Sequence, residues 1–359
     1  MRADINTLDR ELTQQSNMLR TERLDVSFGE ILNMYEHGEI IIDPEFQRLF
    51  RWDEDQKTRF IESLLLGIPI PPIFVAANSE GVWELVDGLQ RISTFLSFVG
   101  VLRLGRQLDK KNKWVLQSGT RVESLEGYTY ETLPQKYRLI LKRAVCRVEI
   151  LKWDSSYDMR YELFNRLNTG GTPLTQQEIR NCIFRDISST FNDFLHRMAG
   201  TSDFKKTVNL SHEQNECLFN EELVLRFMSL YDGGEEIEIR SGFAQYMTDY
   251  MKKALQNEAY DYSEHEKIFL RVFKVLVKLG PTVFRQKNGM FATSLFDVIT
   301  YGVAINIDKY EMEEPERIAN LIDNKVRKNE TFIKFSRRGG NNQKERIVNR
   351  IKVAKEVFQ

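Results

Sequence analysis

Cysteine is scarce in this sequence, and its spacing excludes the common cysteine-based sites. The three cysteines, Cys146, Cys182 and Cys217, stand about 35 residues apart and form no C-x-x-C pair. Neither a zinc site nor a disulfide framework is therefore indicated. This usage fits a reducing compartment, so we expect a cytoplasmic protein.

Long apolar runs are also missing. The N-terminal stretch MRADINTLDRELTQQSN lacks the apolar core of a signal peptide. The most apolar stretch, FIESLLLGIPIPPIFVAA, is interrupted by Glu62 and three prolines. We therefore expect a chain that is neither secreted nor membrane-spanning and has no membrane partner.

Net charge is nearly absent, but the charges are unevenly placed. The formal net charge is -1, yet residues 325–359 hold 11 Lys or Arg against 3 Asp or Glu. A basic tail of this kind indicates a nearby polyanion or a subunit interface, and a solvated helix face is the alternative. The 359 residues, 42% of them hydrophobic, suffice for two compact units or for one domain with a large appendage.

The first 151 residues alternate between short strand and helix patterns. Asp53 and Gln56 form a capping box that begins a helix, and Gly67 ends it. Ser27 is expected to cap a helix that runs through His37. A polar stretch over 101–133 predicts an insertion or a mobile hairpin. Further elements follow from periodicity: strands near 24–26, 40–42, 71–77, 82–86 and 145–151, and a helix over 133–143.

Strand patterns almost vanish after residue 151. A second helix-opening capping box pairs Thr175 with Glu178. The simplest account is an α+β protein with a mixed α/β domain over 1–151 and a helical region over 152–359. Helical periodicity continues at 212–231, 240–257, 263–279, 291–306 and 343–358.

The stretch WELVDGLQRISTFL passes from a strand pattern into a helix pattern at residues 87–91. One interpretation is a capping box, with Asp87 as N-cap, Gln90 at the third helical position and Gly88 as the turn residue. That leaves Arg91 unexplained, since a cation in the first turn opposes the helix dipole. The other interpretation is an anion site, because a helix N-terminus offers N–H donors and partial positive charge.

Three further stretches place polar residues where folding alone does not obviously demand them. In IDPEFQRLFRW, Gln47 and Arg48 follow a proline, and Arg48 is either a surface side chain or a bidentate partner for phosphate. In FNRLNTGGTPL, Asn168 is explained by a helix C-cap, whereas Asn165 could donate to a ligand. The basic segment near the C-terminus contributes candidate DNA contacts at Arg337, Arg338, Arg346 and Arg350. A helix that packs Ile347, Val348 and Ile351 inward and turns its arginines outward explains that segment equally well.

Together, PEFQRLFRW, VDGLQRISTF and FNRLNTGGTPLTQQEIRN resemble the N-terminal domain family of GmrSD-type modification-dependent restriction enzymes. The resemblance covers roughly residues 20–186. It implies a fold similar to ParB and sulfiredoxin, and a module that binds and hydrolyses GTP or ATP in bacterial defence against foreign DNA. The family's Asp-Gly-Gln-Gln-Arg signature falls on residues 87–91, where Leu89 departs from it. The resemblance also carries a nucleotide-binding role to Gln47, Arg48, Asn165, Arg166 and Asn168.

Larger members of that family add a nuclease of the His-Asn-His type. The four histidines here are scattered, without the paired spacing that a metal-assisted nuclease needs. We expect a stand-alone sensor subunit, or one half of a two-chain system with a separately encoded nuclease or modification subunit. A homo-oligomer is compatible with the sequence.

For hydrolysis, we expect Arg48 and Arg91 to grip phosphates together with Gly88 at the helix start. Asp87 would hold Mg²⁺ or orient the water, and Gln90 would position the water or a phosphate oxygen. The chain lacks the pattern G-x-x-x-x-G-K-[ST], so it would not be a P-loop enzyme. Two alternatives stay open: a DNA-binding sensor without turnover, and a structural partner subunit.

Overall fold

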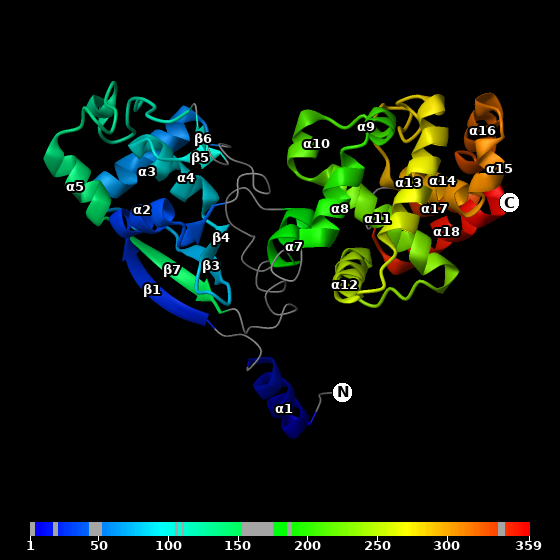
Figure 1. Cartoon of the computed structure of the whole chain (residues 1–359), viewed down its shortest axis with the longest axis horizontal. Helices are drawn as coiled ribbons and strands as arrows, with labels where there is room; N and C mark the ends of the chain where they lie inside the picture. Colours follow the sequence, from blue (N-terminus) through cyan, green and yellow to red (C-terminus); the bar gives the residue numbers. More distant parts are fainter. Residues whose placement is uncertain are drawn as a thin grey trace. The chain divides into compact units, whose positions relative to one another are not determined.

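A computed structural model describes residues 4–16, 21–42, 52–104, 107–109, 111–152, 175–184, 189–336 and 342–359. The chain divides into two compact units, Met1–Pro173 and Leu174–Gln359. Strands gather in the first unit, and the second is helical over its described residues apart from one isolated bridge (Figure 1). The predicted α+β class is confirmed.

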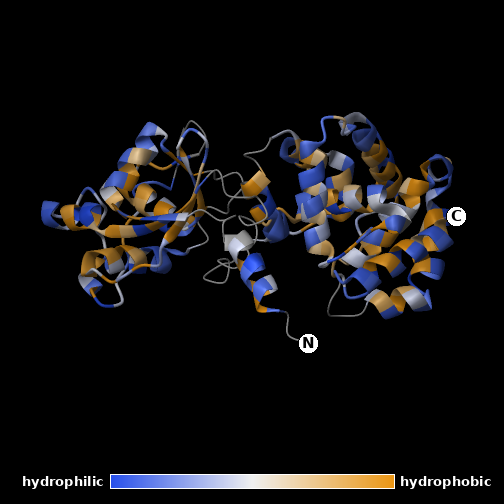
Figure 2. Cartoon of the chain, turned by 90° about the horizontal axis from the view of Figure 1, so that it is seen from below, coloured by the Kyte–Doolittle hydropathy of each residue, from blue (hydrophilic) through white to orange (hydrophobic). Residues whose placement is uncertain are grey.

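A five-stranded mixed sheet forms the frame of the first unit. Its strand order is β1-β7-β3-β4-β2, with β1–β7 and β3–β4 antiparallel and β7–β3 and β4–β2 parallel. The predicted strands are confirmed, and Figure 2 shows apolar segments inside the first unit. Their bounds are β1 Thr21–Ser27, β2 Ile40–Ile41, β3 Ile73–Ala77, β4 Trp83–Asp87 and β7 Val145–Leu151.

Four helices supply most of the rest of this core. Figure 1 shows α2, α3 and α4 together on one side of the β1–β7 pair. Phe28 on α2, Phe95 on α4 and Val148 on β7 are 0% exposed, so the apolar face of the sheet is closed by helices. The bounds are α2 Phe28–His37, α3 Glu54–Leu66, α4 Leu89–Val99 and α5 Gln135–Arg143.

Local capping signals set the ends of these helices. The Ser27 hydroxyl accepts from the Glu30 N–H at 3.1 Å, as expected for an N-cap. Asp53 and Gln56 form the predicted reciprocal capping box of α3, and Gly67 ends that helix with a φ of 67°. These predictions are confirmed because each depends on residues within one turn of one another.

The polar stretch after α4 is fixed to the first unit by buried polar groups of α3. The Glu62 carboxylate, 4% exposed, accepts from the backbone N–H groups of Arg121 and Val122 at 2.7 and 2.8 Å. Thr58 accepts from the N–H of Gln117 at 3.0 Å. The segment contains a small hairpin, β5 Arg103–Leu104 with β6 Gln107–Leu108, and the 3₁₀ turn η1 Glu123–Leu125.

The second unit is built on a buried charge cluster as well as an apolar core. Arg226 and Arg350 both bind the Asp297 carboxylate, with Nη2 of Arg226 and Nη1 of Arg350 at 2.7 and 3.0 Å from Oδ2. Its helices are α7 Gln176–Phe184, α8 Ser189–Ala199, α9 Ser202–Val208, α10 His212–Glu216, α11 Phe219–Gly233, α12 Phe243–Gln256, α13 Tyr262–Leu276, α14 Thr293–Ile305, α15 Ile307–Glu311, α16 Pro315–Leu321, α17 Glu330–Ser336 and α18 Lys344–Phe358. Shorter turns are η2 Gly234–Glu236, η3 Val277–Leu279 and the π-helical η4 Ile322–Val326.

The helix α1, Ile5–Ser16, precedes β1 in the first unit. Across the residues that the structure describes, no helix is long and apolar enough to cross a membrane.

Candidate phosphate-binding junction

The β4–α4 junction differs from the capping box that its sequence suggests. Asp87 is the last residue of β4 and pairs with Phe74 of β3, while Gly88 is the N-cap of α4. Gly88 has no side chain, and no side-chain hydrogen bond caps the helix. The capping-box interpretation of Asp87 and Gln90 is therefore wrong, because strand pairing keeps Asp87 outside the helix. The first N–H groups of α4 are left without the side-chain acceptor that a cap would supply.

Gly88 is required by both backbone and packing. Its φ of 103° lies in the left-handed region that residues with a Cβ avoid. A Cβ added there would stand 2.4 Å from Cγ2 and 2.9 Å from Cβ of Ile73 on β3. The glycine therefore lets the strand turn into the helix while β3 approaches closely.

Arg91 is held within the first turn of α4 by groups of the protein. Its Nη1 donates to the carbonyls of Pro71 and Pro72 at 2.6 and 3.1 Å, and its Nη2 donates to Asp87 Oδ2 at 2.8 Å. The Arg91 side chain is 12% exposed and that of Asp87 is 49% exposed. Arg91 thus has a structural reason to stand in the first turn, and Asp87 is the more accessible partner of the pair.

Gln90 and Leu89 also serve the fold at this junction. Gln90 Oε1 accepts from the backbone N–H of Trp52 at 3.3 Å, which connects α4 to the residue before the N-cap of α3. Leu89 is 7% exposed and belongs to the apolar core of the first unit. The departure at Leu89 from the family signature therefore fills a core position, where leucine is favoured by burial.

The junction thus combines three features within five residues: helix N–H groups without a side-chain cap, a fixed guanidinium, and a half-exposed carboxylate. Such a helix start favours anions through its donors and its partial positive charge. The fixed Arg91 adds a full positive charge to the same turn. The Asp87 carboxylate opposes an anion unless it acts on a water or a cation.

Several predicted site residues lie outside the described part of the chain. These are Gln47, Arg48, Asn165, Arg166, Asn168, Arg337 and Arg338. The predicted meeting of Arg48 with Arg91 therefore stays a prediction.

Arg350 is not suited to the DNA contact that the sequence suggests. It is 1% exposed and bound to Asp297 and to the carbonyl of Phe335. This corrects its assignment, because a guanidinium buried against a carboxylate is not presented to a phosphate backbone. Arg346, on the same helix, is partly exposed. Ile347 and Ile351 pack inward as the alternative interpretation expected, at 0 and 3% exposed. That interpretation is wrong for Val348, which is partly exposed, and for Arg350, which does not face outward.

A buried polar network in the second unit escaped the sequence reasoning. The predicted Thr175–Glu178 box is confirmed, with the Thr175 N–H donating to Glu178 Oε2 at 2.6 Å. The helix α7 that follows buries polar side chains: Arg180 Nε donates to Thr248 of α12 at 3.1 Å, and Asn181 Nδ2 donates to Glu221 of α11 at 2.8 Å. The only local signal is an unusually polar helix, QQEIRNCIF, with few apolar residues to bury.

Among the described residues, no group of three or more His, Cys, Asp or Glu side chains is placed to hold a metal ion.

The first unit is an α+β domain in which strand β4 leads through Gly88 into helix α4, and the start of that helix favours an anion. Residues 28–185 match the family described as GmrSD restriction endonuclease, N-terminal domain, and this segment is a domain of that family. This match indicates that the chain is a component of a restriction system. No curated protein and no solved structure significantly matches the chain.

Proposed function

We propose that the β4–α4 junction binds the phosphates of a nucleoside triphosphate, GTP or ATP, and that the chain hydrolyses it within a restriction system. The observation that carries this proposal is the start of α4 at Gly88, where N–H donors lack a side-chain cap next to the fixed charge of Arg91. An anion at this position would complete the helix and gain from the helix dipole.

The proposed roles follow from what each side chain already contacts. Arg91 would supply a positive charge to the phosphates, and the carbonyls of Pro71 and Pro72 hold its guanidinium in place. Asp87, half exposed, would orient the attacking water. Gln90 holds the Trp52 backbone and thereby the start of α3. The resemblance adds Gln47, Arg48, Asn165, Arg166 and Asn168 as further nucleotide contacts.

Mg²⁺ fits this proposal only as an ion that binds together with the nucleotide. The ion is usually held by one or two carboxylates together with phosphate oxygens and waters. Asp87 supplies one half-exposed carboxylate at the junction. When bound, the ion would neutralise phosphate charge, and Asp87 would hold it with the nucleotide rather than in its absence.

The test compares two aspartates that form the same kind of contact in the same unit. Asp87 pairs with Arg91 at the end of β4. Asp25 pairs with Arg147, with 3.0 Å between Asp25 Oδ1 and Arg147 Nε, and lies on the edge strand β1, which is separated from β4 by β7 and β3. We expect Asp87→Asn to lower phosphate release at least about 100-fold, the usual scale for a water-activating group. Asp25→Asn should leave release unchanged. Phosphate release from four nucleotides, with and without DNA and Mg²⁺, is the assay.

Binding is tested separately by calorimetry. Arg91→Ala should weaken nucleotide affinity by about 1.5–3 kcal/mol, the value of a hydrogen bond to a charged group. Circular dichroism must show that the variant is folded, because Arg91 also binds two carbonyls. Unchanged affinity in a folded Arg91→Ala protein would remove the junction from the nucleotide site. A wild-type chain that binds DNA in a steeply salt-dependent manner, yet releases no phosphate, would instead select a DNA sensor.

A further inference from the structure

The helix α1 carries an apolar stripe that the structure leaves exposed. Ile5, Leu8 and Leu12 are 71, 47 and 59% exposed. Residues spaced by three and four positions share one face of a helix, so these three form a continuous stripe. Large apolar side chains arranged in this way on a helix favour contact with a partner surface.

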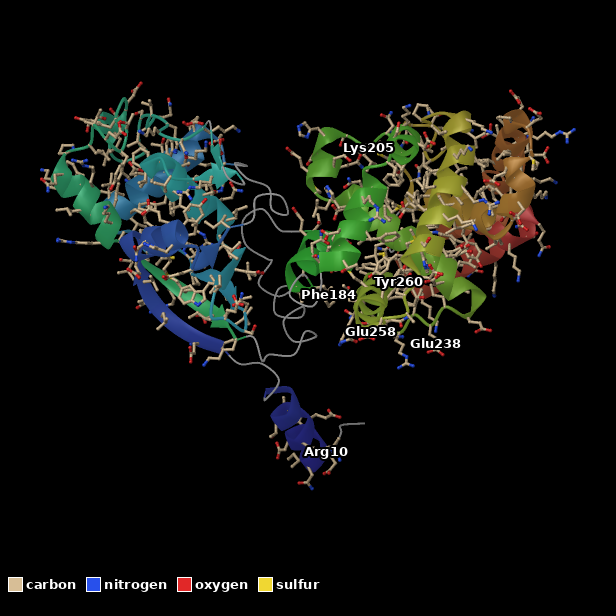
Figure 3. All side chains as sticks on the ribbon, in the orientation of Figure 1. Arg10, Phe184, Lys205, Glu238, Glu258 and Tyr260 are labelled. Atoms are coloured by element: carbon tan, nitrogen blue, oxygen red, sulfur yellow. The ribbon has the colours of Figure 1, made fainter. Side chains whose placement is uncertain are left out.

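Acidic residues border this stripe on both sides. With 3.6 residues per turn, Asp4 and Glu11 lie on one flank of the stripe and Asp9 lies on the other. Arg10, which Figure 3 labels, lies on the opposite side of the helix from the stripe. The helix therefore presents an apolar centre with acidic borders.

The first unit contains a groove with the complementary character. It has a volume of about 640 Å³ and lies between the end of α3 and one face of α5. Ile68, Leu139, Ile140 and Val145 line it and are 48, 38, 42 and 57% exposed. The groove thus offers apolar side chains to solvent.

Basic residues stand at both ends of the α5 face that lines the groove. Lys136 precedes Leu139 by three positions and Arg143 follows Ile140 by three, so all four share one helix face. This order places positive charge on either side of the apolar pair. A helix with an apolar stripe and acidic borders is the matching partner.

We propose that α1 of a second copy of this chain docks in this groove, so that two copies exchange their N-terminal helices. Both surfaces are exposed and carry complementary charge, so each is available to the other in a second copy. A reciprocal exchange forms the contact twice, which helps a 12-residue helix approach the roughly 1,200–2,000 Å² of a stable interface. The inference is independent of nucleotide binding.

The first experiment measures the mass of the full chain by sedimentation equilibrium over a range of concentrations. The wild type should be a dimer. Leu8→Glu on the helix and Ile140→Glu in the groove should each weaken it at least about 30-fold, as expected for a central apolar contact. Met312→Glu, at an 88% exposed residue of the second unit, is the matched control and should stay dimeric. Circular dichroism confirms folding of each variant.

The second experiment identifies the occupant of the groove. A Leu8→Cys chain is mixed with an Ile140→Cys chain and oxidised, and we expect a disulfide-linked pair that the Met312→Cys control does not give with either chain. A monomeric wild type, or a Leu8→Glu variant that remains dimeric, would overturn the proposal. So would a Leu8→Cys, Ile140→Cys double variant that links only within one chain, since the helix would then occupy its own groove.

Discussion

Replacing Gly88 with alanine tests the geometry on which the junction depends. Two costs are expected in the free energy of unfolding of the first unit. The left-handed φ of 103° costs about 1–2 kcal/mol for a residue with a Cβ. The contact at 2.4 Å with Ile73 Cγ2 adds about 1–3 kcal/mol of overpacking. The expected total for Gly88→Ala is therefore about 2–5 kcal/mol.

Gly67 provides a control that separates these two costs. It also has a left-handed φ, 67°, but a Cβ there would meet nothing within 4 Å. Gly67→Ala should therefore show only the conformational cost of about 1–2 kcal/mol. All four tryptophans lie within the first unit, so their fluorescence during urea unfolding reports on this unit alone.

A double-mutant cycle with Ile73→Ala isolates the close contact. Truncating Ile73 to alanine removes Cγ2, the atom 2.4 Å from the new Cβ, and leaves only the Ile73 Cβ contact at 2.9 Å. The double variant should therefore be more stable than the sum of the single effects predicts, by about 1–3 kcal/mol. Equal costs at Gly88 and Gly67, or strictly additive effects in the cycle, would refute the close approach of β3 to the junction.

Three further predictions concern buried groups. Burial opposes protonation of His265, but hydrogen bonds to Asp232 and to the Asp261 carbonyl outweigh it and raise its pKa. Protonated His265 therefore stabilises the second unit fully below about pH 6.5, the ordinary histidine pKa, and this stabilisation is lost as pH rises through the raised pKa. His265→Gln should flatten the pH dependence of the free energy of unfolding of the second unit, measured in urea. Asp297→Ala leaves two buried guanidinium groups without their carboxylate and should cost about 3–5 kcal/mol by thermal unfolding. Burial raises the pKa of the Cys146 thiol to about 11, so iodoacetamide should label Cys146 only after unfolding. Peptide mapping that finds Cys146 labelled in the folded chain at pH 8 would contradict this.

Short-range signals predicted much of the fold, and the two correct capping boxes show why. Asp53 with Gln56 and Thr175 with Glu178 act within one turn, so the sequence contains everything that decides them. The same spacing misled at Asp87, because pairing with Phe74 keeps that residue in β4. The decisive partner lies 13 positions away in the chain, beyond any local pattern.

The sequence drew attention to the β4–α4 junction but did not predict the contacts within it. Arg91 was correctly singled out as unusual for a first helical turn. Its binding to the carbonyls of Pro71 and Pro72 depends on how β3 enters the sheet, which periodicity does not reveal. The prediction of a DNA contact at Arg350 was wrong for the same reason, since its partner Asp297 lies on a different helix.

The contacts of α7 have a practical consequence for dividing this chain. The family match ends at residue 185, just after α7, whereas the compact units divide between Pro173 and Leu174. A fragment that ends at 185 would keep α7 but remove Thr248 and Glu221. The side chains of Arg180 and Asn181 would then lose these hydrogen-bond partners. Such a fragment should be poorly soluble, and expression trials are better begun with a stop near residue 173 or with the whole chain.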